Sequence, residues 1–237
     1  MKITKPTLIL NEGVCKANIA RMVNKAQSHG LELQPHFKTH QSKAIGEWFR
    51  ASGVSKITVS SVGMAMYFAE NGWQDITIAF PCNILEIEAI NDLAQKIELT
   101  LLVDNQAIVE RLDQELHHSV SIYIEINSGG NRSGVPVNDQ ELIKQLAELI
   151  TSTTKLNLKG LYSHAGHTYS ANGEEEIVKI GSSSLNQLIE LKNELMKYYP
   201  QIITCFGDTP SCSVLDDFKG INRISPGNFV FYDVMQT

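Results

Sequence analysis

The sequence predicts an α/β fold, and three observations lead to that prediction. Short β-branched runs alternate with longer segments of helical periodicity along the 237 residues. Two predicted strands, ITIAF at residues 76–80 and ELTLLV at residues 98–103, are almost entirely apolar or β-branched, which is typical of parallel strands buried on both faces. No G-x-G-x-x-G pattern follows the first strand, so a closed parallel (β/α)8 TIM barrel is favoured over an open, doubly wound sheet.

The alternation predicts eight strands and at least six helices. The strands are expected at residues 33–38, 56–60, 75–80, 98–103, 120–127, 157–163, 202–206 and 221–224. The helices are expected at residues 43–51, 63–71, 84–95, 106–117, 139–151 and 173–199. We therefore expect residues 1–228 to form one barrel domain, because barrels of this kind need about 200 to 250 residues.

Residues 229–237 have a different sequence pattern from the barrel that precedes them. The segment FVFYDVM at residues 229–235 predicts a strand, and no partner for it follows. We expect residues 229–237 to be the start of a C-terminal β domain that this chain does not contain. The alternative is a short strand or helix that packs back on the barrel.

Charge and composition argue against several classes of partner. The chain has 20 basic and 26 acidic residues, a net charge of −6, and no visible basic patch for a nucleic acid or an anionic membrane. No run of ~18 apolar residues could span a bilayer, and the first residues lack a signal-peptide core. We therefore expect a cytoplasmic protein. The four cysteines are dispersed, with no C-x-x-C pair, and are expected to be structural or incidental.

The first strand ends in PHFKTH at residues 35–40, which contains a candidate nucleophile. Strand alternation sends His36 and Lys38, and with them His40, towards the barrel interior and Phe37 towards the helices. Burial lowers the pKa of a lysine, and a lowered pKa is what a Schiff-base nucleophile needs. A solvated or ion-paired lysine is the structural alternative. A two-histidine metal site in H-x-K-x-H is a minor one, because no carboxylate or third imidazole is nearby.

Four later loops place polar groups at the ends of predicted strands. The glycine-rich loop at residues 126–134 contains Arg132, which suits an anionic oxygen. The segment YSHAGHTY at residues 162–169 gathers two imidazoles and two phenols. GDTPS at 207–211 and SPGN at 225–228 follow the last two strands, where barrels most often bind phosphate. One ligand, pyridoxal phosphate, accounts for all of these places and for Lys38.

These motifs, taken in order, resemble the D-serine dehydratase and D-threonine aldolase family. Its members are pyridoxal phosphate enzymes of the alanine racemase type (fold type III), so the resemblance implies a barrel like the alanine racemase N-terminal domain. The resemblance extends from about residue 6 to residue 236 and implies a lyase that acts on a D-amino acid. Loss of the β-hydroxyl would make it a dehydratase, and cleavage of the Cα–Cβ bond an aldolase.

The resemblance also implies residue roles. Lys38 would form the internal aldimine with pyridoxal phosphate and move the α-proton, and Arg132 would face the phenolic oxygen or ring of the cofactor. Thr209, Gly227 and Asn228 would hold the phosphate. The remaining residues expected to line the pocket are His36, Tyr162, His164 and Tyr169.

The sequence departs from the family pattern in two ways. Ser225 stands where alanine racemases often have an arginine that meets the pyridine nitrogen, so racemisation is no better supported than elimination. Family members also have a second, β-rich domain with a divalent metal site, so we expect the zinc or manganese ligands to lie outside this chain. A homodimer is implied as well. An amino acid racemase, a non-catalytic pyridoxal phosphate carrier and a barrel without cofactor remain the alternatives.

Overall fold

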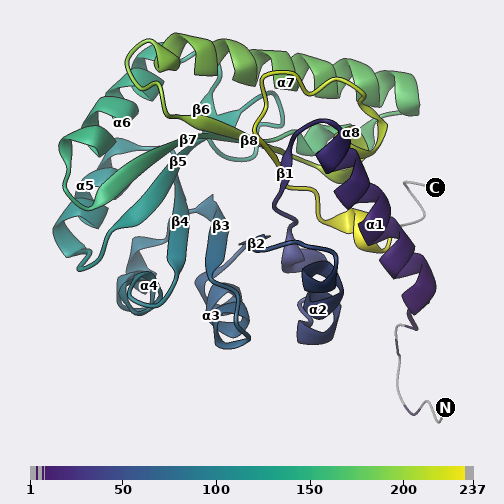
Figure 1. Ribbon diagram of the computed structural model, residues 1–237. Coiled ribbons are helices and arrows are strands. Elements are labelled where there is room, and N and C mark those ends of the chain that lie inside the picture. Colours follow the sequence, from purple (N-terminus) through teal and green to yellow (C-terminus); the bar gives the residue numbers. More distant parts are fainter. Residues whose placement is uncertain (1–3, 5–6, 8, 233–237) are drawn as a thin grey trace.

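The computed structural model describes residues 4, 7 and 9–232, which form a nearly closed parallel barrel with helices on its outside (Figure 1). The strand order is β1-β9-β8-β7-β5-β4-β3-β2, with β6 paired to β5 outside this path. The predicted parallel barrel is thus confirmed. The strands are β1 Glu32–Leu33, β2 Lys56–Val59, β3 Asp75–Pro81, β4 Glu98–Val103, β5 Val120–Asn127, β6 Val135–Pro136, β7 Leu156–His164, β8 Ile203–Gly207 and β9 Arg223–Ile224.

The helices follow the strands in the predicted alternation. They are α2 Lys43–Ala51, α3 Val62–Glu70, α4 Ile87–Ala94, α5 Gln106–Glu115, α6 Gln140–Ser152, α7 Glu174–Met196 and α8 Thr209–Val214. A further helix, α1 Glu12–Ser28, precedes β1 and was not predicted. Asn11 caps it, because its side-chain oxygen accepts from the backbone N–H of Val14 over 3.2 Å. None of the helices over the described residues has the length and hydropathy that a membrane span requires.

The first strand closes the barrel by meeting the last strand on one side and β2 on the other. The backbone N–H of Gln34 donates to Ile224 O over 2.9 Å, and the N–H of Thr58 donates to Pro35 O over 2.9 Å. The side chain of Gln34, which is fully buried, donates to Ile57 O and to Thr77 Oγ1. These bonds join β1 to β2 and β3, so the sheet has no open edge at this seam.

Charged side chains fill the end of the barrel at which the strands begin. Lys56 Nζ lies 2.9 Å from Asp75 Oδ2 and 3.3 Å from Glu32 Oε1, and Arg223 also pairs with Glu32. Each of these residues is the first of its strand. Such pairs stabilise one end of a barrel, and they leave the opposite end, called the barrel mouth below, for chemistry.

Two predicted strands are wrong at the ends of the barrel. The strand expected at residues 33–38 stops at Leu33, and Phe37–Thr39 form a 3-10 turn, η1, because the His36 ring accepts from the backbone N–H of Lys38. The strand expected at residues 229–235 is not formed over residues 229–232, the part of it that the structure describes. Asn228–Val230 make another 3-10 turn, η4, whose apolar side chains are fully buried beside α1. Residues 233–237 lie outside the described part.

Candidate active site

Lys38 lies in η1, at the barrel mouth, and an aromatic cluster anchors the turn that holds it. The Phe37 ring is fully buried, with centroids 5.0 Å from Phe49, 5.0 Å from Phe68 and 5.1 Å from Trp73. Phe37 therefore faces the helices as predicted, while the neighbouring Lys38 side chain stays accessible. Partial desolvation, followed by the positive charge of Arg132, lowers the pKa of Lys38. More of this amine is consequently in its nucleophilic form than in an ordinary lysine.

The two histidines beside Lys38 have separate environments. His36 faces the mouth, and burial together with the nearby charges of Lys38 and His164 holds its pKa well below the usual value. His40 instead stacks on Phe49 at 5.7 Å, and burial lowers its pKa to about 4. Since His40 belongs to the aromatic cluster outside the mouth, His36 and His40 are not placed to bind one metal ion together. Over the described residues, no three His, Cys, Asp or Glu side chains are close enough to hold a metal ion.

The loop after β5 carries Arg132 to the same mouth. Its shape depends on Asn127, whose side-chain oxygen accepts from the backbone N–H groups of Gly129 and Asn131, each over 3.0 Å. The Arg132 side chain is exposed, and its charge lowers the pKa of His164 and of Lys38. The charge of Arg132 therefore reaches both Lys38 and His164, so the predicted arginine and lysine lie at the same end of the barrel.

The end of β7 and the loop after it hold three of the residues predicted to line the pocket, Tyr162, His164 and Tyr169. The rings of His164 and Tyr169 lie 6.5 Å apart, and burial followed by Arg132 and Lys38 lowers the His164 pKa to about 4. Tyr162 is buried below them, 6.0 Å from the ring of Tyr123, and burial raises its pKa. At neutral pH this side of the mouth therefore holds neutral rings.

His167, in the same loop, was not predicted as a site residue. Its ring lies against Gly129 and Gly130, where an added Cβ would be 3.3 Å from Nε2 and 3.4 Å from Nδ1. Those two glycines thus let the Arg132 loop approach the aromatic loop closely. The sequence contained both motifs, but it held no signal that they would meet.

The two predicted phosphate loops meet each other and the lysine turn. The backbone N–H of Asn228 donates to Thr209 Oγ1 over 2.9 Å, and the N–H of Thr209 donates to the Tyr169 hydroxyl over 3.2 Å. Gly227 lies so close to η1 that a Cβ there would be 2.8 Å from His36 O. The two loops and the lysine turn therefore lie against one another at the barrel mouth.

Asp208, which precedes Thr209, was read from sequence only as a turn residue. Its Oδ1 accepts from the backbone N–H of Ser211 over 2.7 Å and from Thr168 Oγ1 over 2.8 Å. The residue is 1% exposed, and burial raises its pKa to about 6 against these hydrogen bonds. Asp208 thus holds parts of the site in place through hydrogen bonds, while its own buried side chain does not line the site.

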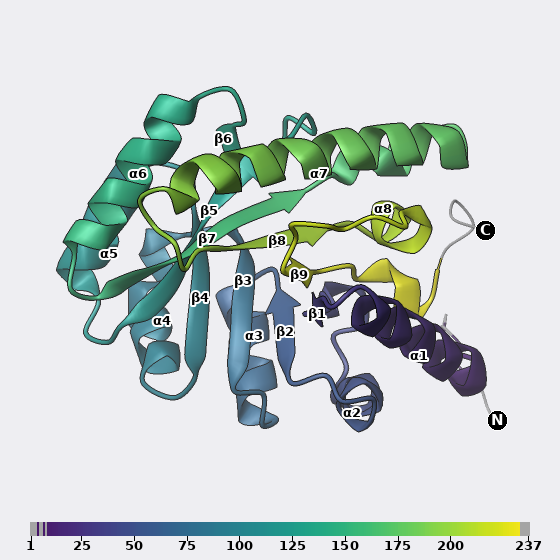
Figure 2. The ribbon, with the colours of Figure 1, turned by 45° about the horizontal axis from the view of Figure 1, so that its top comes forward.

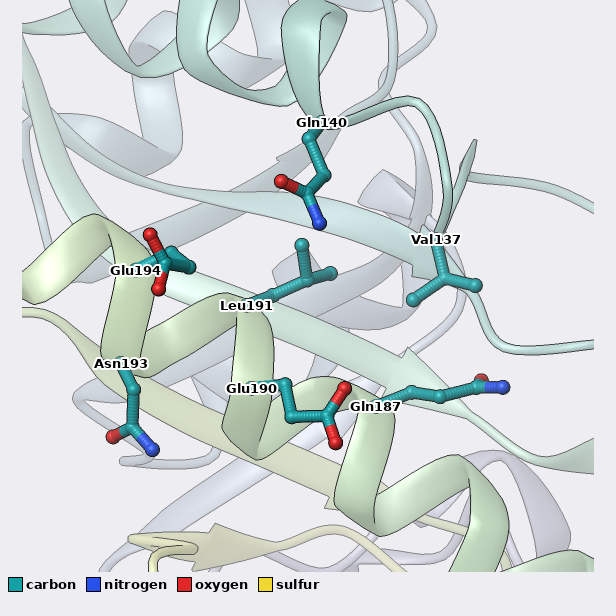
Figure 3. Close-up of a pocket in the computed structure, with 7 residues that line it drawn as sticks. All are labelled: Val137, Gln140, Gln187, Glu190, Leu191, Asn193 and Glu194. Carbon is teal, nitrogen blue, oxygen red and sulfur yellow. The ribbon is translucent and has the colours of Figure 1, made fainter.

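A groove on the outside of the barrel shares no residue with the mouth (Figure 3). It lies between α7 and the start of α6, and the acidic side chains of α7 project into it. Its lining residues are Val137, Gln140, Gln187, Glu190, Leu191, Asn193 and Glu194. We assign it no role in the chemistry of Lys38.

The fold and the arrangement at the mouth define a barrel domain of the alanine racemase type. The chain belongs to this family, because its residues 11–233 match the family described as alanine racemase, N-terminal domain. The family leaves the reaction undetermined, since it comprises more than one activity.

Three relatives are similar to this chain over almost its whole length. The chain is similar to D-threo-3-hydroxyaspartate dehydratase from Delftia sp., whose structure aligns with a TM-score of 0.93 and 26% identity over 98% of this chain and 62% of that one. It is 26% identical to a D-serine dehydratase from Dictyostelium discoideum, covering 99% of this chain and 64% of the relative. It is also 25% identical to a D-threonine aldolase from Arthrobacter, covering 98% and 62%. The chain thus spans less than two thirds of the length of these relatives.

Proposed function

We propose that this chain is the cofactor-binding barrel of a pyridoxal phosphate-dependent D-amino acid lyase of the dehydratase or aldolase type. The observation that carries the proposal is the accessible Lys38 amine, whose pKa is lowered at a mouth shared with Arg132. The family is one of pyridoxal phosphate enzymes, and the relatives named above are dehydratases and an aldolase.

The residues at the mouth fit pyridoxal phosphate. Lys38 Nζ is the amine that would bind its aldehyde carbon, and Arg132 would face its phenolic oxygen. Thr209, Gly227 and Asn228 would hold its phosphate. Gly227 supports this fit, because only a residue without a Cβ lets the last loop lie against His36 O. The residues that would surround the ring are His36, Tyr162, His164 and Tyr169.

The residues of the chain have distinct tasks in the proposed reaction. When bound, pyridoxal phosphate supplies an electron-withdrawing ring that stabilises negative charge at the substrate α-carbon. The Lys38 amine takes the α-proton, and its lowered pKa favours the unprotonated form that can accept it. The imidazoles of His36 and His164 stay neutral at pH 7 and so add no positive charge beside the amine.

Ser225 gives no specific support to racemisation. Its hydroxyl is buried and lies 2.9 Å from Thr58 Oγ1, so it is directed into the barrel wall. A hydroxyl held in this way offers the ring nitrogen no charged partner, whereas an acidic partner would keep that nitrogen protonated. Ser225 therefore supports racemisation no better than elimination.

The rest of the assembly is part of the same proposal. We propose a cytoplasmic homodimer in which residues after 228 lead to a β-rich domain, with zinc or manganese bound by residues outside the described part. The substrate is a small D-amino acid. The length of the relatives supports a further domain, since the aligned region covers 62–64% of them.

Covalent capture tests the cofactor step. The protein is mixed with pyridoxal phosphate and reduced with borohydride, and the modified peptide is identified by mass spectrometry. We expect one adduct, on Lys38, which Lys38→Ala abolishes and Lys144→Ala, on the exposed face of α6, leaves intact. A protein without colour or adduct would contradict the cofactor assignment.

Turnover tests the reaction class. We expect pyruvate and ammonia from D-serine, oxaloacetate and ammonia from D-3-hydroxyaspartate, or glycine and acetaldehyde from D-threonine, with no activity on the L-forms. Cofactor binding without turnover of any of these would replace the lyase by the carrier alternative.

A further inference from the structure

Asp208 joins the two loops that carry opposite sides of the proposed cofactor site. On one side, its Oδ1 accepts from Thr168 Oγ1 over 2.8 Å, and Thr168 lies in the loop between His164 and Tyr169. On the other side, Asp208 directly precedes Thr209 and caps α8 by accepting from the Ser211 N–H over 2.7 Å. One carboxylate oxygen therefore fastens both loops.

The bond between Thr168 and Asp208 is shielded from solvent. Asp208 and Thr168 are each 1% exposed, and Ser211 is fully buried where α8 lies beside α7 (Figure 2). Gly181 of α7 allows this approach, because a Cβ there would be 2.6 Å from Ser211 Oγ. A hydrogen bond in such surroundings constrains geometry more strongly than one exposed to water.

A helix cap accounts for only one of the two hydrogen bonds that Asp208 Oδ1 accepts. The bond from the Ser211 N–H caps α8, whereas the bond from Thr168 Oγ1 comes from another loop. None of the ion pairs formed by residues 9–232 includes Asp208, and its Oδ2 is buried with no hydrogen-bond partner among them. Within that range, the one hydrogen bond of its side chain that reaches beyond its own helix is the bond to Thr168.

We propose that Asp208 is a positioning residue that fixes the spacing between the ring side and the phosphate side of the cofactor site, so that a single ligand reaches both. The ring side is the His164–Tyr169 loop, and the phosphate side is formed by Thr209 and Asn228. This inference rests on the proposed function. It assigns Asp208 no contact with the ligand itself.

A fixed spacing has a specific thermodynamic consequence. A ligand with two linked halves binds more tightly than either half because the second contact forms at a high effective concentration. That advantage is lost when the two subsites drift relative to each other, even if each subsite is intact. The spacing therefore affects affinity for pyridoxal phosphate much more than affinity for pyridoxal or inorganic phosphate alone.

The test compares these three ligands on matched variants of Thr168 and Asp208. Thr168→Val removes the hydroxyl at nearly constant volume, while Thr168→Ser retains it. Asp208→Ala removes the acceptor, while Asp208→Asn retains Oδ1. Dissociation constants are measured by absorbance for pyridoxal phosphate and pyridoxal, and by competition for phosphate, and thermal melting confirms that each variant is folded.

We expect Thr168→Val and Asp208→Ala to weaken pyridoxal phosphate binding about tenfold, which corresponds to one lost hydrogen bond to a charged group. Affinity for the two half-ligands should change less than about threefold, and the conservative variants Thr168→Ser and Asp208→Asn should keep most of the wild-type affinity. Unchanged pyridoxal phosphate affinity in both disruptive variants, or an equal loss for all three ligands, would overturn this inference alone. A wild-type protein that binds none of the three ligands would overturn the proposed function and this inference with it.

Discussion

The backbone N–H of Asn228 donates to the Thr209 hydroxyl over 2.9 Å, although the two residues belong to different strand-end loops. The backbone N–H of Thr209 in turn donates to the Tyr169 hydroxyl over 3.2 Å. The loops after β8 and β9 thereby form one surface instead of two separate turns. This surface is where we place the phosphate of the cofactor.

Removal of the Arg132 charge should raise the pKa of Lys38. Desolvation and Arg132 both lower that pKa in the wild type, so Arg132→Met leaves only the first cause. The pH at which Lys38 becomes reactive should then move upward. A small acylating reagent, followed by mass spectrometry of the Lys38 peptide across pH, measures this without the cofactor. Arg111→Met, on exposed α5, should leave the profile unchanged, and an identical profile for both variants would contradict the assignment.

Gly227→Ala should destabilise the protein and weaken cofactor binding. A Cβ at this position would be 2.8 Å from His36 O and 3.3 Å from Thr39 Oγ1, so the last loop must move away from the lysine turn. Overpacking of this kind costs about 1–3 kcal/mol of unfolding free energy. Chemical denaturation measures it. Gly63→Ala is the matched control, since a Cβ there meets nothing within 4 Å; equal effects of the two substitutions would argue against a steric role.

Asp208→Asn should stabilise the protein in a pH-dependent manner. The Asp208 pKa is raised to about 6 by burial, whereas an unfolded aspartate titrates near ~3.9. The wild type therefore loses stability as pH rises from about 4 to about 6, because the folded state holds its proton longer. The variant has no such proton, so its advantage should grow over that window to about 3 kcal/mol at most. Melting curves at pH 4 and pH 7 measure it, and a constant difference would refute the raised pKa.

Gln34→Met should weaken the seam of the barrel. The Gln34 amide donates to Ile57 O and Thr77 Oγ1 and accepts from Arg223, so the substitution leaves buried partners unsatisfied. We expect a loss of about 2–3 kcal/mol in unfolding free energy. Gln114→Met, at an exposed position on α5, serves as the control and should be nearly neutral.

The sequence predicted the regular part of the barrel well, because buried parallel strands and amphipathic helices have local patterns. β4 at Glu98–Val103 and α2 at Lys43–Ala51 have the predicted bounds. The errors arise where a tertiary or side-chain contact overrides the local pattern. η1 replaces a strand because His36 binds the Lys38 N–H, and η4 replaces one because its apolar residues are buried beside α1.

The site was predictable only in part, for a similar reason. Strand alternation predicted that Phe37 and Lys38 face opposite ways, and the family resemblance supplied the other ring and phosphate residues. Asp208 and His167 were missed because their partners lie far along the chain: Thr168 is 40 residues from Asp208. No periodicity or motif spacing encodes a contact between two loops.

The seam between β1 and β9 also sets the order in which the molecule can be built. The N–H of Glu32 donates to Asn222 O, and that of His36 donates to Pro226 O. During synthesis, Lys38 is made early, but the backbone partners of its turn appear only about 190 residues later. A ribosome-bound chain must therefore hold β1 unpaired on this side until translation has passed residue 226. Long-range closure of this kind is slow, and it makes the turn that holds Lys38 one of the last parts of the protein to fold.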